Sequence, residues 1–200
     1  GRELTPDDTP LEAGLGFAVR LDTGLPFLGR EALLRQKAQP LTKRLVTYKR
    51  ADGVDLSGIL YLPPNYTPKK DPPLPVLMWA YPAEFKSASA AGQVRDSPFR
   101  FVGPSVQRPV PFTLRGYAVL DNPTFPIVGE GKAEPNDTYV KQLSEGAQAA
   151  VDELARRGVG DPQRMAIGGH SYGAFTCANL LAHTDLFRAG IARSGAYNRT

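Results

Sequence analysis

Short apolar runs alternate with amphipathic stretches from about residue 40 onward. Four such runs read VLMWA, YAVL, MAIG and AGIA, at residues 76–80, 117–120, 165–168 and 189–192. Runs of this kind form parallel strands that are buried on both faces. Between the second and third runs, apolar residues recur at spacings of three and four, namely Val140, Leu143, Ala147, Val151 and Leu154. This stripe predicts a helix that Asp137 or Thr138 caps and that runs to Arg157. Strands alternating with helices indicate a parallel sheet with right-handed crossovers.

A hairpin is predicted ahead of these strands, because residues 44–49 (RLVTYK) and 56–62 (LSGILYL) flank an Asp-Gly turn signal at Asp52-Gly53. Residues 84–115 are irregular, with one helix expected near Leu114. The first 40 residues have too few apolar positions for a core of their own and show one short helix signal at 31–37. We therefore expect two unlike pieces, 1–40 and 41–200.

Composition excludes several function classes. The net charge of +4 is modest and spread along the chain, so it predicts no nucleic-acid partner. No window of 18 apolar residues exists, which predicts no membrane span. No Cys/His/Asp spacing indicates a metal, and no glycine loop indicates a nucleotide, so we expect neither metal nor cofactor. The one cysteine, Cys177, is expected to be buried, and with no secretory signal the sequence favours a cytoplasmic location.

The pentapeptide 169–173 (GHSYG) fits G-x-S-x-G between an apolar run and a helical pattern. Strand, tight turn with serine at its apex, then helix is the nucleophile elbow of α/β-hydrolases. Ser171 is therefore the candidate nucleophile, and the backbone N–H of Tyr172 is a candidate oxyanion donor, because it opens a helix and is unpaired there. The alternative is a serine in an ordinary glycine-rich turn.

Neither of the two histidines suits the general base. His170 directly precedes Ser171, so in a tight elbow its side chain diverges from the hydroxyl, and a packing or hydrogen-bonding role is expected. His183 lies one helix length away, roughly 18 Å at 1.5 Å per residue, where a cation suits a helix C-terminus. Asp185 lies near the same distal end and is too far to act as the acid. The base and its orienting carboxylate are expected outside this sequence.

Longer motifs carry two family resemblances. Residues 48–54 (YKRADGV), 78–86 (MWAYPAEFK), 126–131 (PIVGEG), 168–175 (GGHSYGAF) and 190–200 (GIARSGAYNRT) closely resemble the prolyl oligopeptidase clan, in particular its glutamyl endopeptidase branch, which includes a chloroplast glutamyl peptidase. Residues 1–4, 9–19 and 27–33 resemble the aminomethyltransferase family and the folate domains of sarcosine and dimethylglycine dehydrogenases. That second match covers a slice without the family's folate-binding or catalytic residues.

The peptidase resemblance implies further roles. In the clan a tyrosine just after the first core strand, here the run 76–80, donates a hydrogen bond from its hydroxyl to the oxyanion, and Tyr81 occupies that position. The alternative is a buried tyrosine that packs at the end of the strand. Acidic specificity requires a cationic pocket, for which Arg193 or Arg199 are candidates. The family's Asp and His follow later in the chain, and its β-propeller precedes the peptidase domain.

These observations predict an α/β-hydrolase, with a doubly wound, mostly parallel sheet that ends after the strand following the nucleophile helix. The predicted function is a serine-type peptidase of the glutamyl endopeptidase type that hydrolyses peptides, with the 200-residue chain inactive by itself. The alternatives are an esterase that shares the elbow and a non-catalytic folate-binding or interaction fragment. The sheet edge beyond Ile191 is expected to be exposed and to pair with another chain.

Overall fold

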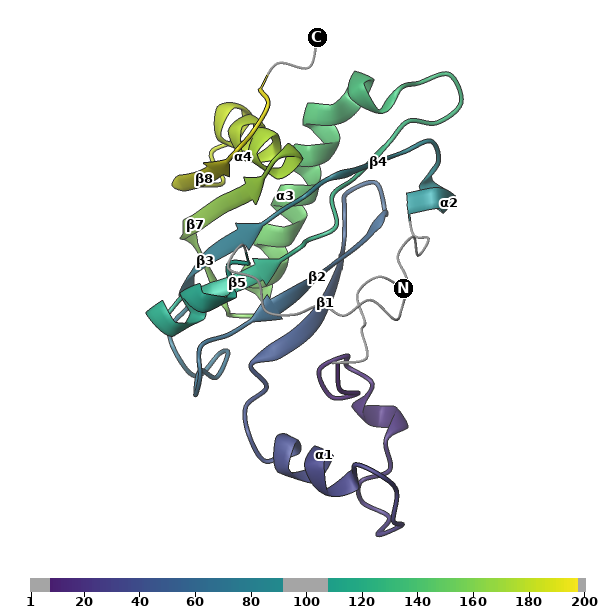
Figure 1. Ribbon diagram of the computed structural model, residues 1–200, viewed down its shortest axis with the longest axis vertical. Helices are drawn as coiled ribbons and strands as arrows, with labels where there is room; N and C mark the ends of the chain where they lie inside the picture. The colour runs from purple at the N-terminus through teal and green to yellow at the C-terminus, as the bar shows by residue number, and fades with distance from the viewer. Residues whose placement is uncertain (1–7, 92–107, 198–200) are drawn as a thin grey trace.

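The computed structural model describes residues 8–91 and 108–197 and centres on one six-stranded sheet (Figure 1). The strand order is β1-β2-β5-β3-β7-β8. The bounds are β1 (Lys43–Lys49), β2 (Asp55–Tyr61), β3 (Leu74–Trp79), β5 (Ala118–Asp121), β7 (Gly160–His170) and β8 (Ala189–Arg193). The β1–β2 hairpin joins β5 in antiparallel fashion, whereas β5, β3, β7 and β8 are parallel to one another. The predicted hairpin and mostly parallel sheet are both confirmed.

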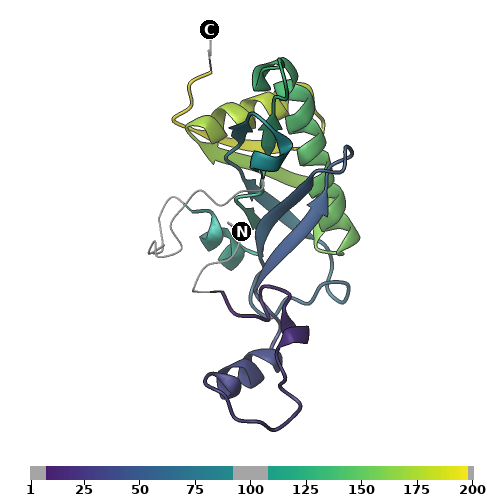
Figure 2. The same cartoon turned by 90° about the vertical axis from the view of Figure 1, so that its right-hand side faces the viewer.

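The sheet is covered on both faces. Helices α3 (Tyr139–Arg156) and α4 (Tyr172–His183) contact β7 and each other, and they lie on one side of the sheet, whereas the 3₁₀ helix η2 (Val110–Arg115) lies on the other (Figure 2). This division follows from handedness. The chain moves from β5 to β7 to β8 in one direction but from β3 to β5 in the other, so right-handed connections place them on opposite faces.

The core lies between the sheet and α3. Leu143, Ala147, Val151 and Leu154 of the predicted stripe are buried against the sheet, while Val140 is only partly buried. Tyr139, Gly146 and Ala150 are buried as well. The buried face of α3 is wider than the predicted stripe because α4 packs beside it.

The segment before β1 has little core. It holds the short helices η1 (Gly16–Ala18) and α1 (Arg30–Lys37), neither of which contains a buried residue. Phe17 is 86% exposed and Leu28 fully exposed, and Leu21 is the one buried hydrophobic residue in the described part of this segment. It joins the sheet through backbone and ionic contacts, including the Lys43–Asp8 ion pair at 2.5 Å. Whether 1–40 and 41–200 are separate domains stays a prediction.

A two-stranded parallel ribbon stands apart from the main sheet. It consists of β4 (Ala83–Phe85) and β6 (Pro126–Val128), with Glu84 in register with Ile127. The short helices α2 (Ala88–Ala91) and η3 (Pro135–Thr138) lie close to it in sequence. The sequence predicted neither β4 nor β6, because strands of three residues are too short to show a periodic pattern.

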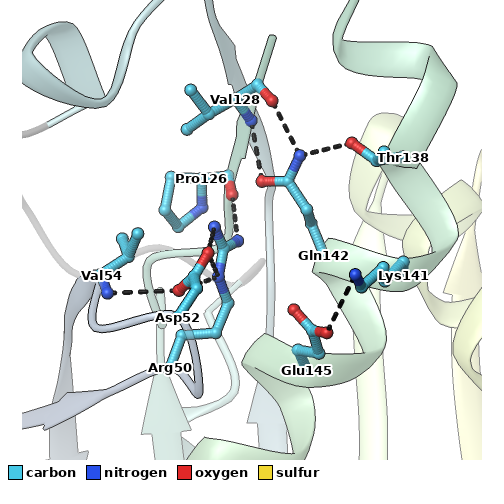
Figure 3. Close-up of polar contacts among 9 residues, drawn as sticks. All are labelled: Arg50, Asp52, Val54, Pro126, Val128, Thr138, Lys141, Gln142 and Glu145. Carbon is cyan, nitrogen blue, oxygen red and sulfur yellow. Dashed lines mark hydrogen bonds and ion pairs between the residues drawn. The ribbon is translucent and has the colours of Figure 1, made fainter. Parts of the chain in front are cut away.

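Two side chains hold β6 in place (Figure 3). The buried guanidinium of Arg50 donates to the Pro126 carbonyl at 3.0 Å and pairs with Asp52 at 2.7 Å. From the other side, the amide of Gln142 accepts from the Val128 N–H at 3.0 Å and donates to the Val128 carbonyl at 2.8 Å. The ribbon is thereby fixed to both the hairpin and α3.

Arg50→Met is expected to lower the free energy of unfolding by about 2 kcal/mol, because a hydrogen bond from a charged donor in a buried place contributes roughly 1.5–3 kcal/mol. Arg50 also lowers the pKa of Asp52, chiefly through their hydrogen bond. Asp52 therefore stabilises the fold above its unfolded pKa, and this contribution is lost as pH falls through its folded pKa. Urea unfolding of the wild type and of Arg50→Met should show that the difference between their free energies of unfolding shrinks at acidic pH.

Lys49→Met is the matched control, since Lys49 pairs with Asp55 on the same hairpin but both side chains are well exposed. Exposed pairs contribute little, so this variant should unfold within about 0.5 kcal/mol of the wild type. Equal effects of the two substitutions would contradict the role given to Arg50.

Candidate active site

Ser171 lies alone between β7, which ends at His170, and α4, which begins at Tyr172. Its backbone has φ 56° and ψ −116°, a strained conformation for a residue with a side chain. The residue is exposed, and its N–H donates to the Arg193 carbonyl at 3.0 Å. The structure therefore places Ser171 at the carboxyl edge of the parallel strands, where ligands bind in open α/β sheets.

The two glycines of the pentapeptide make this turn sterically feasible. A Cβ on Gly173 would lie 2.2 Å from the Ala80 carbonyl oxygen. A Cβ on Gly169 would lie 2.5 Å from backbone atoms of Gly173 and 2.7 Å from the same Ala80 oxygen. These contacts are with backbone, which cannot move aside, so the end of β3, the end of β7 and the start of α4 pack closely only because both positions lack a side chain.

The two residues that carry the candidate oxyanion donors both lie at this edge. Tyr172 is the first residue of α4, directly after Ser171, and Tyr81 follows the end of β3, which is the neighbour of β7. The rings of Tyr81 and Tyr172 meet edge to face, with centroids 6.0 Å apart. Tyr81 is 54% exposed, so it is not the buried packing residue of the alternative interpretation.

Glu84 was not predicted as a site residue, yet its Oε1 accepts a hydrogen bond from the Tyr172 hydroxyl. Burial raises the pKa of Tyr172, and the hydrogen bond to Glu84 raises it further. The Tyr172 phenol thus stays protonated and can remain the donor. The only sign in the sequence was a lone glutamate four residues after Ala80, the last residue of the apolar run 76–80. Such a glutamate is equally compatible with a partner of the site and with a surface carboxylate.

The two histidines have different surroundings. His170 ends β7 and is half-buried, and its Nδ1 is buried with no hydrogen-bond partner among residues 8–91 and 108–197. His183 is exposed in the last turn of α4, with Nδ1 2.9 Å from the Asn179 carbonyl. Asp185 follows just after α4 and is exposed. Within the described ranges no hydrogen bond joins His170, His183 or Asp185 to Ser171.

The two candidate arginines have different outcomes. Arg193 is the last residue of β8; it is in register with His170, and its side chain is exposed. The carbonyl that accepts from Ser171 is its own, so its side chain starts beside the elbow. Arg199 lies outside the described residues.

Other groups contribute no further chemistry. Cys177 is fully buried in α4, as expected, and burial raises its pKa. Within the described ranges no cluster of His, Cys, Asp and Glu could hold a metal ion, and no helix is long and apolar enough to cross a membrane. Two surface grooves of about 380 and 450 Å³ lie along α3, and neither includes Ser171.

Different parts of the chain match different known proteins. Residues 137–200 match the family model described as the prolyl oligopeptidase family. Over 161 residues the chain is 58% identical to proteins named probable glutamyl endopeptidase, chloroplastic, from Oryza sativa subsp. japonica and Arabidopsis thaliana. The match covers 80% of this chain but 17% of each relative.

The second resemblance is also confirmed. Over 57 residues the chain is 51% identical to human mitochondrial sarcosine dehydrogenase. This match covers 28% of this chain and 6% of that protein. An aminomethyltransferase from Alkaliphilus metalliredigens is 50% identical over 52 residues, or 26% of this chain and 14% of the relative.

Solved structures confirm the predicted α/β-hydrolase fold. The crystal structure of Porphyromonas gingivalis dipeptidyl peptidase 4 superposes with a TM-score of 0.54 at 24% identity, covering 82% of this chain and 22% of that one. At this identity the likeness concerns the fold.

The expected cytoplasmic location is wrong, because both glutamyl endopeptidase relatives are named as chloroplastic proteins. A single cysteine and the lack of a secretory signal do not distinguish a cytosolic protein from a plastid one, so the sequence features behind that expectation could not decide it.

In both sequence and fold, the α/β part of the chain is similar to the prolyl oligopeptidase family of serine peptidases, as the motifs around Trp79 and Ser171 predicted.

Proposed function

We propose that this chain supplies the nucleophile and the oxyanion donors of a serine peptidase of the glutamyl endopeptidase type. The observation that supports this most is the strained Ser171 at the carboxyl edge of the sheet, held by close backbone packing at Gly169 and Gly173. Strain at a solvent-facing serine is retained where the surrounding structure enforces it, and such positions cluster at active sites.

The chemistry follows from this arrangement. The Ser171 Oγ attacks the carbonyl carbon of a peptide bond while its proton passes to a general base, and the carbonyl oxygen becomes an oxyanion. The Tyr172 N–H and the Tyr81 hydroxyl donate hydrogen bonds to that oxyanion. The base then gives its proton to the leaving amine, and water releases the acyl group from Ser171.

Within the described ranges neither His170 nor His183 is hydrogen-bonded to Ser171, so we propose that the base and its carboxylate come from elsewhere in a longer polypeptide. The family resemblance implies that this Asp and His follow later in a longer polypeptide. The relatives are much longer than this chain, which spans 17% of their length.

For specificity, we propose that Arg193 attracts the acidic side chain of the substrate. Its exposed guanidinium starts from the residue whose carbonyl binds the Ser171 N–H. A guanidinium pairs with a carboxylate through two parallel hydrogen bonds. The names of the glutamyl endopeptidase relatives support this substrate class and, in addition, a plastid location.

The test joins this chain in frame to the residues that follow the matched region in the rice relative. The joined polypeptide should cleave a peptide after glutamate, and Ser171→Ala should abolish the cleavage. Arg193→Met should lower kcat/KM for the glutamate peptide at least tenfold while changing that for a matched glutamine peptide less than twofold. Cleavage of a simple ester without cleavage of any peptide would instead indicate an esterase, and turnover that survives Ser171→Ala would contradict the proposal.

A further inference from the structure

Tyr172 has two functions at the elbow. Its backbone N–H opens α4 directly after Ser171, and its side chain belongs to an aromatic cluster with Tyr81, Tyr139 and Phe175. The Tyr139 and Phe175 rings stack on it at centroid distances of 5.9 Å, and the Tyr81 ring meets its edge at 6.0 Å. The orientation of this ring therefore bears on Tyr81, the second candidate oxyanion donor.

Tyr81 depends on this contact more than its neighbours do. The Tyr139 ring is buried and its hydroxyl lies 3.1 Å from Thr176 Oγ1, so other contacts hold it. Tyr81 is more than half exposed, and an exposed side chain keeps one rotamer only if a fixed surface supports it. The Tyr172 ring is such a surface, in the edge-to-face arrangement that aromatic pairs prefer.

The Tyr172 ring is in turn tied to Glu84, which accepts a hydrogen bond from its hydroxyl. Glu84 is the central residue of β4 and is half-buried. It is in register with Ile127 of β6, and β6 is held by Arg50 on one side and Gln142 on the other (Figure 3). Although Glu84 lies on a short ribbon, its strand is therefore anchored through β6 to the hairpin and to α3.

We infer that Glu84 is a positioning residue that holds the Tyr172 ring, and through that ring Tyr81, in the orientation needed for oxyanion binding. Its consequence for catalysis rests on the proposed function, but the contacts themselves do not. A hydrogen bond from a phenol to an ionised carboxylate is stronger than one between neutral groups. A glutamate here thus holds the ring more firmly than a neutral acceptor would.

The test uses the 200-residue chain labelled with ¹³C-tyrosine, with Tyr172→Phe and Tyr81→Phe to assign the resonances. In Glu84→Ala, the nuclear Overhauser effect between the Tyr81 and Tyr172 rings should fall to less than half of its wild-type intensity. Glu84→Gln keeps a neutral acceptor, so its ring contact should lie between those of Glu84→Ala and the wild type.

Lys86→Met is the control directly after β4, because Lys86 forms an exposed ion pair with Glu134 rather than a contact with Tyr172. It should leave the ring contact unchanged. If Glu84→Ala does not fold, Glu84→Gln still gives the result, because its ring contact must be weaker than that of the wild type. Wild-type ring contacts in the glutamate variants would overturn the inference without bearing on Ser171 as nucleophile.

Discussion

Gly173→Ala is expected to lower the free energy of unfolding by about 3 kcal/mol or more, since overpacking a tight site costs 1–3 kcal/mol and more where nothing can move. The new methyl group would lie 2.2 Å from the Ala80 carbonyl oxygen, and that residue is itself buried. Alanine is favoured over glycine by about 1 kcal/mol inside a helix. This gain offsets part of the steric cost, so the measured drop in the free energy of unfolding would be smaller than the cost of the clash itself. Urea unfolding followed by the fluorescence of Trp79, the only tryptophan, measures it.

Gly146→Ala in α3 is the matched substitution. Its Cβ would meet the edge of the Phe125 ring at 3.1 Å, which a side chain can relieve by a small shift. The gain in helix propensity offsets that strain, and the variant should remain within about 1 kcal/mol of the wild type. If the two glycine variants proved equally stable, the elbow would not depend on close backbone packing.

The second large effect concerns activity. The 200-residue chain should hydrolyse a glutamate-containing peptide about 10⁶-fold more slowly than the joined polypeptide, which is the scale of loss when a triad loses its base. The cause is local, because Ser171 has no general base among the described residues. Parallel rate measurements on the two polypeptides test this, and Ser171-dependent turnover by the short chain at a comparable rate would contradict it.

Most of the fold could be predicted because its elements are long or strongly patterned. The buried strand β3, the stripe of α3 and the elbow all follow from residue spacing. One exception is β7, which begins at Gly160, five residues before the predicted run at 165–168, and includes Pro162. The pairing of β3 with β7 moves from Leu74↔Gly160 to Val76↔Met165, so Pro162 lies in an irregular stretch where no ladder hydrogen bond is required of it.

The candidate site could be predicted only where it lies on these elements. Ser171 and Tyr172 were found from the pentapeptide, and Tyr81 from a family resemblance. Glu84 and the buried Arg50 were missed, because each acts through partners far away in sequence, Tyr172 and Pro126. Periodicity and local spacing in the sequence do not predict a contact between residues 88 or 76 positions apart.

The self-association predicted at the sheet edge has a structural basis but no test so far. All five residues of β8 are exposed, and in the described part of the chain β8 pairs with β7 alone. An unpaired edge is a template for another strand, and the residues that follow in a longer polypeptide would compete for it.

Covalent labelling shows whether Ser171 is a nucleophile whose general base lies elsewhere in a longer polypeptide. A fluorophosphonate reacts with an activated serine, and peptide mass spectrometry locates the adduct. The joined polypeptide should be labelled stoichiometrically at Ser171, and neither its Ser171→Ala variant nor the 200-residue chain should react at a comparable rate. A label on a different serine of the joined polypeptide, or equal labelling of Ser171 in both polypeptides, would contradict the account.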